Sequence, residues 1–381
     1  MYISEILSNR RLFHSVASYI LFFIAGAAAF NGFYVKAGFA DSAGYDYSTG
    51  NELDVKGPRT LEPMLDGTGG RPYVFRQLLP FIANTIDRAI PSRIVDRLYN
   101  LRNSGGILLR EKWCRSAVER DRIYFLRYWL IYILEIISFF LATLLGYWLC
   151  LSIGISRPAS ALAAISWILL FPFFIENGGY IYDPPEMVFF FLAALLAIKK
   201  RWIWLIPVAA LATANKESFL FFIPLLYPLL RQYSSKVASI LHLGLAAIPC
   251  ILINIYLHLA YRLNPGENME SHLGLQVSCL RDRIVMNHFH MTYSVPHPQS
   301  ENILSILFLT WAFVLAWKHI PKAFRLHFEI ACGINLPLYI FFGFPGEIRA
   351  LSFLYISFLV LLATHLNCWV QDSRKVLAAE L

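Results

Sequence analysis

The amino-acid sequence predicts an all-α polytopic membrane protein, organised as a single integral-membrane domain over residues 1–381. Of the 381 residues, 57% are hydrophobic and only 15% are charged, whereas about a quarter of an average soluble protein is charged. The mean hydropathy is +0.52. Apolar runs of helical length recur along the chain. The net charge of +8 is carried by bases beside these runs, which makes anionic membrane lipids nearer partners than nucleic acid.

We expect about ten transmembrane helices. The first apolar run is about twice as long as the hydrophobic part of a signal peptide, so we interpret it as a retained span. The fourth to sixth runs are short, at about 13 residues, and contain prolines that kink helices. The expected spans are 13–36, 124–152, 158–175, 186–198, 202–214, 218–230, 237–258, 302–317, 328–343 and 349–366.

The distribution of Lys and Arg predicts that both termini are cytoplasmic, which makes 37–123 and 259–301 the large extracytoplasmic loops. Only loops shorter than about 60 residues report orientation, so the Arg-rich first loop is left out of the comparison. The short segments of the predicted inner face carry Arg10, Arg11, Arg157, Lys199, Lys200, Arg201, Arg231, Lys236, Lys318, Lys322, Arg325, Arg374 and Lys375. Those of the outer face carry only Lys216, Arg262, Arg281, Arg283 and Arg349.

The first extracytoplasmic loop is expected to contain juxtamembrane amphipathic helices. In RPYVFRQLLPFIANTIDRAIPSRIVDRLYNLRN, apolar residues from Val74 to Ile90 recur at helical spacing with charged residues among them. Pro80 predicts that a helix starts or kinks there. Such helices lie in the membrane interface with the apolar face towards the lipid.

The same loop contains two pairs of candidate functional residues. Asp41 and Asp46 follow the first span closely, where a carboxylate can act as general base; the alternative is an acidic turn exposed to solvent. Arg71 and Arg76 precede the interfacial helix and offer planar forks for phosphate oxygens. Anchoring to lipid headgroups is the alternative for these two arginines.

Three further charged motifs, ENGGYIYDPPE, NKES and FPGEIR, emerge on the same side of the membrane when the spans are threaded. Asp183 and Glu186 flank two prolines, and we expect them to contact substrate or metal, or to serve only as a cap and turn. Lys216 is expected to neutralise a lipid phosphate, and Glu217 is expected to orient Lys216. An ion pair at the membrane edge is the alternative.

Like NKES, the motif FPGEIR places an acidic and a basic residue at the edge of an apolar span, here the last one. Its Arg349 is a second candidate phosphate ligand and Glu347 a supporting acid, with an ion pair again as the alternative.

Other polar residues carry weaker signals. His288 and His290 have poor spacing for a metal site, and we assign no metal ligands. Glu135, in the middle of the second span, is expected to hydrogen-bond a Tyr or Asn. Cys114 and Cys279 are the two cysteines in outer loops, and whether they pair is left open. The chain has no GxxxxGK[ST], GxSxG, HExxH or CxxC motif, so ATP hydrolysis, serine hydrolysis and zinc proteolysis lack support.

The chain resembles the GT-C superfamily of integral-membrane glycosyltransferases, with one span, a large outer loop with juxtamembrane helices, and then many spans. RPYVFRQLLP, GGYIYDPPE, NKES and GEIR resemble strings in small bacterial proteins of this type. The resemblance implies a polyprenyl-phosphate-linked sugar donor and an acidic catalytic residue early in the first outer loop, where Asp41 matches best and Asp46 next. Lys216 or Arg349 would bind the donor phosphate, with Arg71 and Arg76 as further candidates. The chain departs from the pattern in lacking a paired DE or DxD after the first span.

The functional expectation is therefore a cell-envelope glycosyltransferase of the bacterial inner membrane with its site on the extracytoplasmic face. An Asp base would drive an inverting displacement onto a lipid-linked glycan, polysaccharide or protein acceptor. No cofactor is assigned, and a divalent metal is left open. The alternatives are a polysaccharide polymerase or ligase, a non-enzymatic transporter or flippase of lipid-linked substrate, and a scaffold. A transporter predicts polar residues in several spans and paired half-repeats.

Overall fold

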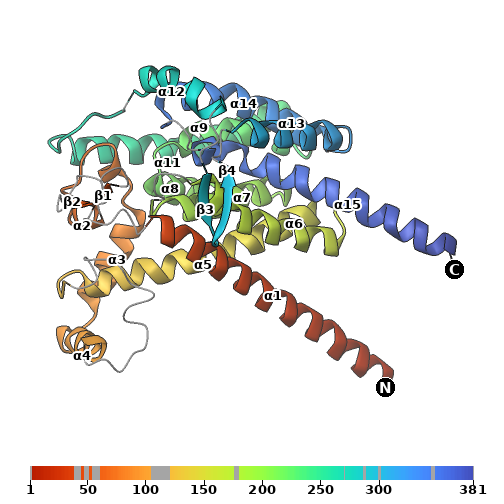
Figure 1. The fold of residues 1–381 in the computed structure, drawn as a ribbon, viewed down its shortest axis with the longest axis horizontal. Helices are drawn as coiled ribbons and strands as arrows, with labels where there is room; N and C mark the ends of the chain where they lie inside the picture. Colours follow the sequence, from red (N-terminus) through yellow and green to blue (C-terminus); the bar gives the residue numbers. More distant parts are fainter. Residues whose placement is uncertain are drawn as a thin grey trace.

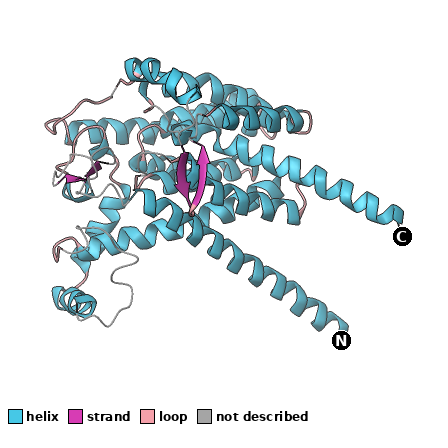
Figure 2. Ribbon diagram, viewed as in Figure 1, coloured by secondary structure: helices cyan, strands magenta, loops and turns pink. Residues whose placement is uncertain are grey.

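The computed structural model describes residues 2–37, 44–46, 51–53, 61–103, 121–175, 180–269, 271–285, 289–298, 302–344 and 348–380. The described chain is dominated by helices, with two small hairpins beside them (Figure 2). Its first half forms α1 (Tyr2–Ala37), β1 (Gly44–Asp46), β2 (Asn51–Leu53), α2 (Leu61–Asp66), η1 (Tyr73–Phe75), α3 (Leu78–Ala89), α4 (Ser92–Asn103), α5 (Phe125–Ser152), α6 (Arg157–Leu170), η3 (Phe171–Phe174) and α7 (Asp183–Ile198).

The second half continues the bundle of helices and adds the second hairpin. Its elements are η4 (Trp202–Trp204), α8 (Leu205–Asn215), α9 (Phe219–Phe222), η5 (Ile223–Leu226), α10 (Tyr227–Arg231), α11 (Lys236–Ala260), α12 (Leu273–Val285), β3 (Phe289–Thr292), β4 (Val295–Pro298), α13 (Ile303–Trp317), α14 (Lys322–Phe342), η6 (Ile348–Leu354) and α15 (Tyr355–Glu380). Both hairpins are antiparallel, with Gly44 opposite Leu53 and Phe289 opposite Pro298.

The bundle has two distinct ends. The two termini lie at one end, whereas α2, α3, α4 and the β1–β2 hairpin gather at the other (Figure 1). We call the latter the α2–α4 end. This arrangement agrees with a large first loop folded at a single end of the bundle. Which side of a membrane that end faces stays a prediction from the Lys and Arg distribution.

The centre of the bundle is α5, which packs against α1, α6 and α7, while α8 packs against α11 and α6 against α15. Large aromatic side chains fill the space between these helices. Phe33, Phe139 and Phe171 are fully buried, and their ring centroids lie 5.5–6.3 Å apart. A glycine permits the close approach of α1 and α5, because a Cβ at Gly26 would lie 3.0 Å from the backbone nitrogen of Phe140.

Five helical segments in the described part of the chain are long and apolar enough to cross a membrane, and they indicate a membrane protein. Their outer faces are apolar: on α11, for example, Val237 is 77% and Leu252 60% exposed. The predicted total of about ten is not confirmed, because the remaining helices do not meet this criterion of length and composition. The five segments are Val16–Tyr34, Phe125–Ser152, Arg157–Phe174, Lys236–Ala260 and Ile348–Gln371.

The short central segments accommodate their prolines at helix starts and not as kinks within long helices. Pro207 is the third residue of α8, and Pro224 and Pro228 are each the second residue of a short helix. A proline in a first turn loses no hydrogen bond, since those N–H groups have no intrahelical partner. The segment 219–231 is thereby divided into α9, η5 and α10.

The first loop forms helices that pack on the bundle, but the expectation that the apolar face lies towards the lipid is wrong for α3. This helix begins at Leu78, with Pro80 in the first turn, and packs against α5. Leu79 and Ala83 are buried in this contact, whereas Phe81 is 67% exposed. The apolar face of α3 thus contacts the protein, while its opposite side remains open.

Candidate functional site

Six charged side chains come together at the α2–α4 end of the bundle. Four separate segments supply them: Arg76 follows η1, Asp183 and Glu186 belong to the first turn of α7, Lys216 and Glu217 follow α8, and Arg349 belongs to η6. We call these residues the charge cluster: Arg76, Asp183, Glu186, Lys216, Glu217 and Arg349. The prediction that the three motifs emerge together is confirmed by the ion pairs between them.

The two carboxylates of α7 are held rigidly at the start of the helix. Pro184 and Pro185 occupy its first positions, where a fixed φ suits the helix. The backbone N–H of Tyr180 donates to Asp183 Oδ2 at 3.0 Å. Asp183 and Glu186 are each only 3% exposed, so both carboxylates depend on cations and hydrogen-bond donors nearby.

Lys216 lies where α8 ends in extended backbone, and it bridges the two carboxylates. Its Nζ donates to Glu186 Oε2 at 2.7 Å and lies 3.6 Å from Asp183 Oδ1. The preceding Asn215 donates to the carbonyl oxygen of Tyr182 at 2.8 Å and so joins the end of α8 to the start of α7. The ammonium group is therefore fixed between two buried acids.

Arg349 completes this inner half of the cluster from the other end of the sequence. Its Nη1 donates to Asp183 Oδ2 at 2.5 Å, and the side chain is 8% exposed. Ser352, in the same helix, donates to Glu186 Oε1 at 3.1 Å. Each acid of α7 is therefore bound by residues of two other segments.

Arg76 and Glu217 form the outer pair. Arg76 Nε and Nη2 donate to the two oxygens of Glu217 at 3.2 and 3.1 Å, a bidentate geometry. The expectation that Glu217 orients Lys216 is wrong, because Lys216 binds the acids of α7 instead. Burial alone would raise the pKa of Glu217, but Arg76 outweighs it and lowers that pKa below the usual value.

Tyrosine rings separate and cover the cations. The guanidinium of Arg76 lies 4.0 Å from the ring centroid of Tyr182, and that of Arg349 lies 4.7 Å from the ring of Tyr180. The two rings stack at 5.1 Å with an interplanar angle of 7°. Sequence reasoning missed both tyrosines, although the Tyr-Ile-Tyr string directly before DPPE was the available signal.

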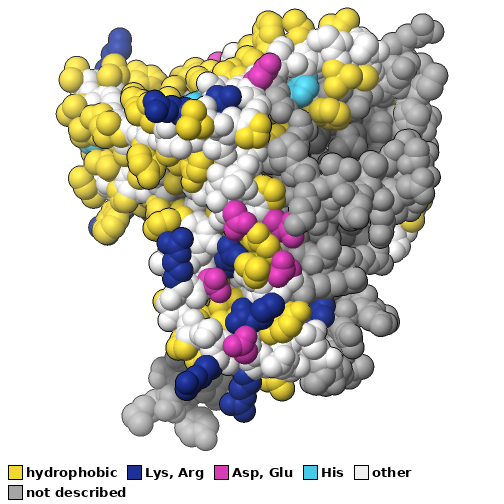
Figure 3. Space-filling model, turned by 90° about the vertical axis from the view of Figure 1, so that its left-hand side faces the viewer, with side chains coloured by type: hydrophobic (Ala, Val, Ile, Leu, Met, Phe, Trp, Pro, Cys, Tyr) yellow, Lys and Arg dark blue, Asp and Glu magenta, His cyan; other side chains and the backbone are white. Residues whose placement is uncertain are grey.

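The charge cluster balances three basic and three acidic side chains. Burying charges is costly, and apolar residues of equal volume often stabilise a fold as well as a buried ion pair does. Arginine and lysine bind phosphate oxygens, and carboxylates accept hydrogen bonds from hydroxyls. The surface of the α2–α4 end also carries charges of both signs over its central and lower parts (Figure 3).

The other predicted site residues lie outside this cluster or outside the described residues. Arg71 donates to Asn268 Oδ1 at 3.2 Å and binds the segment after α11. Asp46 lies in β1, where the structure describes its backbone only. Asp41 and Glu347 lie outside the described residues.

Glu135 is fully buried in α5, close enough to Asp183 for the two carboxylates to interact. The expectation of a hydrogen bond to Tyr or Asn is wrong: neither carboxylate oxygen has a hydrogen-bond partner among the described residues. Within those residues, no group of three or more His, Cys, Asp or Glu is placed to hold a metal ion. Cys279 is a free thiol, and Cys114 and His288 lie outside the described residues.

No family model, no curated protein and no solved structure matches the chain.

Proposed function

We propose that this chain is a membrane glycosyltransferase of the GT-C type, which transfers a sugar from a polyprenyl-phosphate carrier to an acceptor at the α2–α4 end. The charge cluster is the observation that carries this proposal. Four segments distant in sequence bring three cations, three carboxylates and a pair of stacked tyrosines to one place near the ends of apolar helices. Ionisable residues gathered at membrane depth are costly to bury and are characteristic of functional sites.

Each part of the cluster has a role in the proposed reaction. Lys216 and Arg349 bind the carrier phosphate and stabilise the negative charge that develops on it as the sugar leaves. Arg76 adds a planar fork at the outer edge of the cluster. Asp183 and Glu186 hold these cations in place and accept hydrogen bonds from sugar hydroxyls.

The first outer loop supplies the base in this proposal. Asp41 or Asp46 removes the proton from the acceptor hydroxyl as it attacks the sugar carbon, and the polyprenyl phosphate departs with the bonding electrons. Inversion at that carbon follows from a single displacement. Both residues follow α1 closely in sequence, and α1 ends at the same end of the bundle as α2.

The test uses the full-length protein in liposomes with a panel of polyprenyl-phosphate-linked hexoses and pentoses, measuring sugar release and transfer. Lys216→Met is expected to lower binding of polyprenyl phosphate, read as the loss of its stabilising effect on thermal unfolding. Asp41→Asn or Asp46→Asn is expected to lower the transfer rate about a hundredfold or more while that stabilisation is retained. Separate effects on binding and rate distinguish the two roles.

Arg122→Gln is the matched control, because Arg122 forms an exposed ion pair with Asp96 at the same end of the molecule. It should leave both readouts unchanged. Full transfer by the Lys216 variant and by both Asp variants would contradict the assignment. If the intact lipid-linked sugar crosses the bilayer without being cleaved, the protein is a transporter. If the products grow in length, it is a polymerase.

A further inference from the structure

A second site of different character lies at the turn between α7 and α8. A cavity of about 420 Å³ opens there, lined among others by Lys200, Arg201, Trp202, Trp204 and His242. Because α7 has 16 residues and rises about 1.5 Å per residue, the turn lies about 24 Å from Asp183 along that helix. The cavity is therefore separate from the charge cluster and lies near the opposite end of the bundle.

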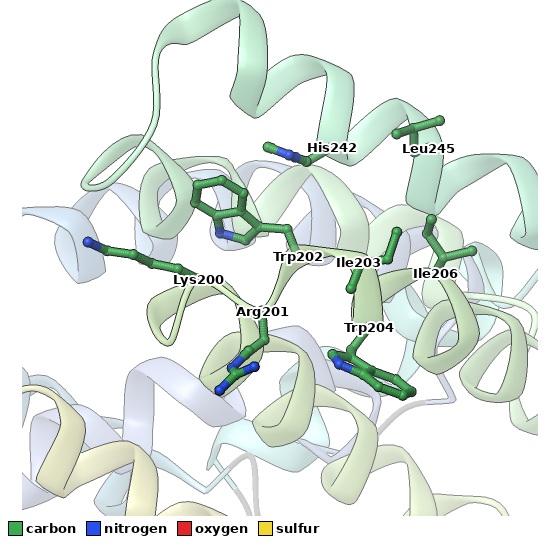
Figure 4. A pocket seen from close by; sticks show the side chains of 8 residues that line it. All are labelled: Lys200, Arg201, Trp202, Ile203, Trp204, Ile206, His242 and Leu245. Carbon is green, nitrogen blue, oxygen red and sulfur yellow. The ribbon is translucent and has the colours of Figure 1, made fainter.

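The lining of this cavity is divided into a cationic part and an apolar part. Figure 4 shows the Lys200 side chain extending to the left and that of Arg201 extending downwards, whereas Ile203, Ile206 and Leu245 lie to the right. The apolar part is open to the surroundings of the protein, since Ile203 is 70% exposed. A ligand that fills both parts must carry negative charge at one end and hydrocarbon at the other.

The two cations are available to such a ligand. None of the salt bridges formed within the described residues involves Lys200 or Arg201. The Lys200 ammonium lies 4.9 Å from the ring of Tyr233, a contact that holds the side chain and leaves its charge in place. Trp202 packs against the ring of His242 at 4.4 Å and forms a firm wall between the two parts.

The position of the cavity also favours a lipid. Trp204 is 58% exposed beside the cationic turn, and tryptophan rings concentrate where hydrocarbon meets headgroups. Val237 and Leu241, both exposed on the neighbouring α11, continue the apolar surface. Basic pockets between membrane helices are suited to anionic lipid headgroups.

We propose that this cavity binds one anionic phospholipid, with its phosphate at the cationic turn formed by Lys200 and Arg201 and its acyl chains against Ile203, Trp204 and Ile206. A protein that is merely anchored at the membrane interface, without a specific lipid site, needs only basic residues and a tryptophan on a convex surface. Here the backbone turns back on itself, with Lys200 at a φ of 60°, and His242 and Leu245 of α11 line the other side, which leaves a half-open recess. Its volume is large enough for a phosphoglycerol headgroup.

The experiment uses the full-length protein in neutral detergent with phosphatidylglycerol, phosphatidylcholine or inorganic phosphate as probes. Native mass spectrometry counts the bound lipid, and thermal unfolding measures stabilisation. Phosphatidylglycerol is expected to bind about tenfold more tightly than phosphatidylcholine, and inorganic phosphate to give no stabilisation. The double variant Lys200→Gln with Arg201→Gln should lose the preference between the two lipids.

Two further variants keep the test decisive. Arg157→Gln with Lys322→Gln removes the same number of charges from helix starts outside the cavity lining and should retain the preference. Trp204→Ala keeps both charges and should weaken the binding of both lipids. The proposal is overturned if phosphatidylcholine binds equally well, if inorganic phosphate stabilises as much as the lipid, or if the Arg157 and Lys322 control loses as much preference as the cavity variant.

Discussion

At the scale of the residue, the pair formed by Arg76 and Glu217 shows how a single charge is secured at the edge of the bundle. The Arg76 side chain is 10% exposed and that of Glu217 is 26% exposed, and both guanidinium contacts are close to 3 Å. A partly buried bidentate pair contributes more than an exposed one, because water screens it less. Removing either partner leaves the other poorly solvated.

This pair should make stability depend on pH. Since Arg76 lowers the pKa of Glu217 below its usual 4.5, the stabilisation is complete above that value and is lost as the pH falls through the lowered pKa. We expect Glu217→Gln to lower the thermal stability at pH 7, and the difference from the parent protein to shrink as the pH is lowered below 4.5. Thermal unfolding in detergent, recorded from pH 7 downwards, measures this difference. Asp96→Asn, at an exposed ion pair, is the control. A difference that is the same at every pH would contradict the expectation.

The sequence located most of the charged residues of the cluster but not their partners. Asp183, Glu186, Lys216 and Arg349 were singled out because ionisable residues at membrane depth are costly. The choice of Glu217 as the partner of Lys216 failed because adjacent residues in an extended segment point to opposite sides. Long-range partners depend on how helices rotate against each other, which the local pattern does not contain.

At the scale of the element, Arg127 in the first turn of α5 joins two helices of the first loop to the bundle. Its guanidinium donates to Asp66 at the end of α2 at 3.1 Å and to Asn84 of α3 at 3.3 Å. Tyr124 donates to the same Asp66, and burial together with this hydrogen bond raises the pKa of Tyr124 to about 12. Because Arg127 is 11% exposed, few waters compete for these contacts.

We expect Arg127→Ala to loosen α2 and α3 from α5 at a cost on the order of 2 kcal/mol, because Asp66 and Asn84 lose a shared donor. Limited proteolysis between residues 61 and 123 should become faster while the long helices stay protected. Arg122→Ala is the matched control: its pair with Asp96 is exposed and should change stability by less than about 1 kcal/mol. Equal proteolysis of the two variants would show that Arg127 has no such role.

The sequence predicted which segments form helices, but it did not predict where most of those helices begin and end. The expected span 328–343 begins at Lys322 in the structure, and the last helix continues past residue 366 to Glu380. In both cases a stretch with polar and charged residues, six residues in α14 and fourteen in α15, extends the helix beyond the expected apolar span, and hydropathy does not register such stretches. The start of α3 was placed correctly because proline marks a first turn directly.

At the scale of the whole molecule, the two ends of the bundle differ in chemistry. The α2–α4 end carries mixed charges and the charge cluster, and the opposite end carries basic turns between helices. Apolar faces on α1 and α11 connect the two ends. This polarity fits a bilayer with the basic turns in the cytoplasm.

Single cysteines in a background with the native cysteines replaced test this orientation. Arg97→Cys, on the exposed face of α4, should react with a membrane-impermeant maleimide in intact cells. Lys322→Cys, at the start of α14, should react only after the membrane is permeabilised. Labelling of both positions from outside, or the reverse pattern, would contradict the orientation and move the charge cluster to the cytoplasmic face.

The exact balance of cations and acids in the charge cluster has a consequence for how any anion enters. A cluster without surplus positive charge offers an incoming phosphate little net electrostatic gain until one of its own carboxylates is neutralised or released from its partner. We therefore expect binding of an anion to be accompanied by uptake of a proton or by an exchange of ion-pair partners. If a proton is taken up, affinity rises as the pH falls, and in either case the balanced cluster discriminates against stray anions.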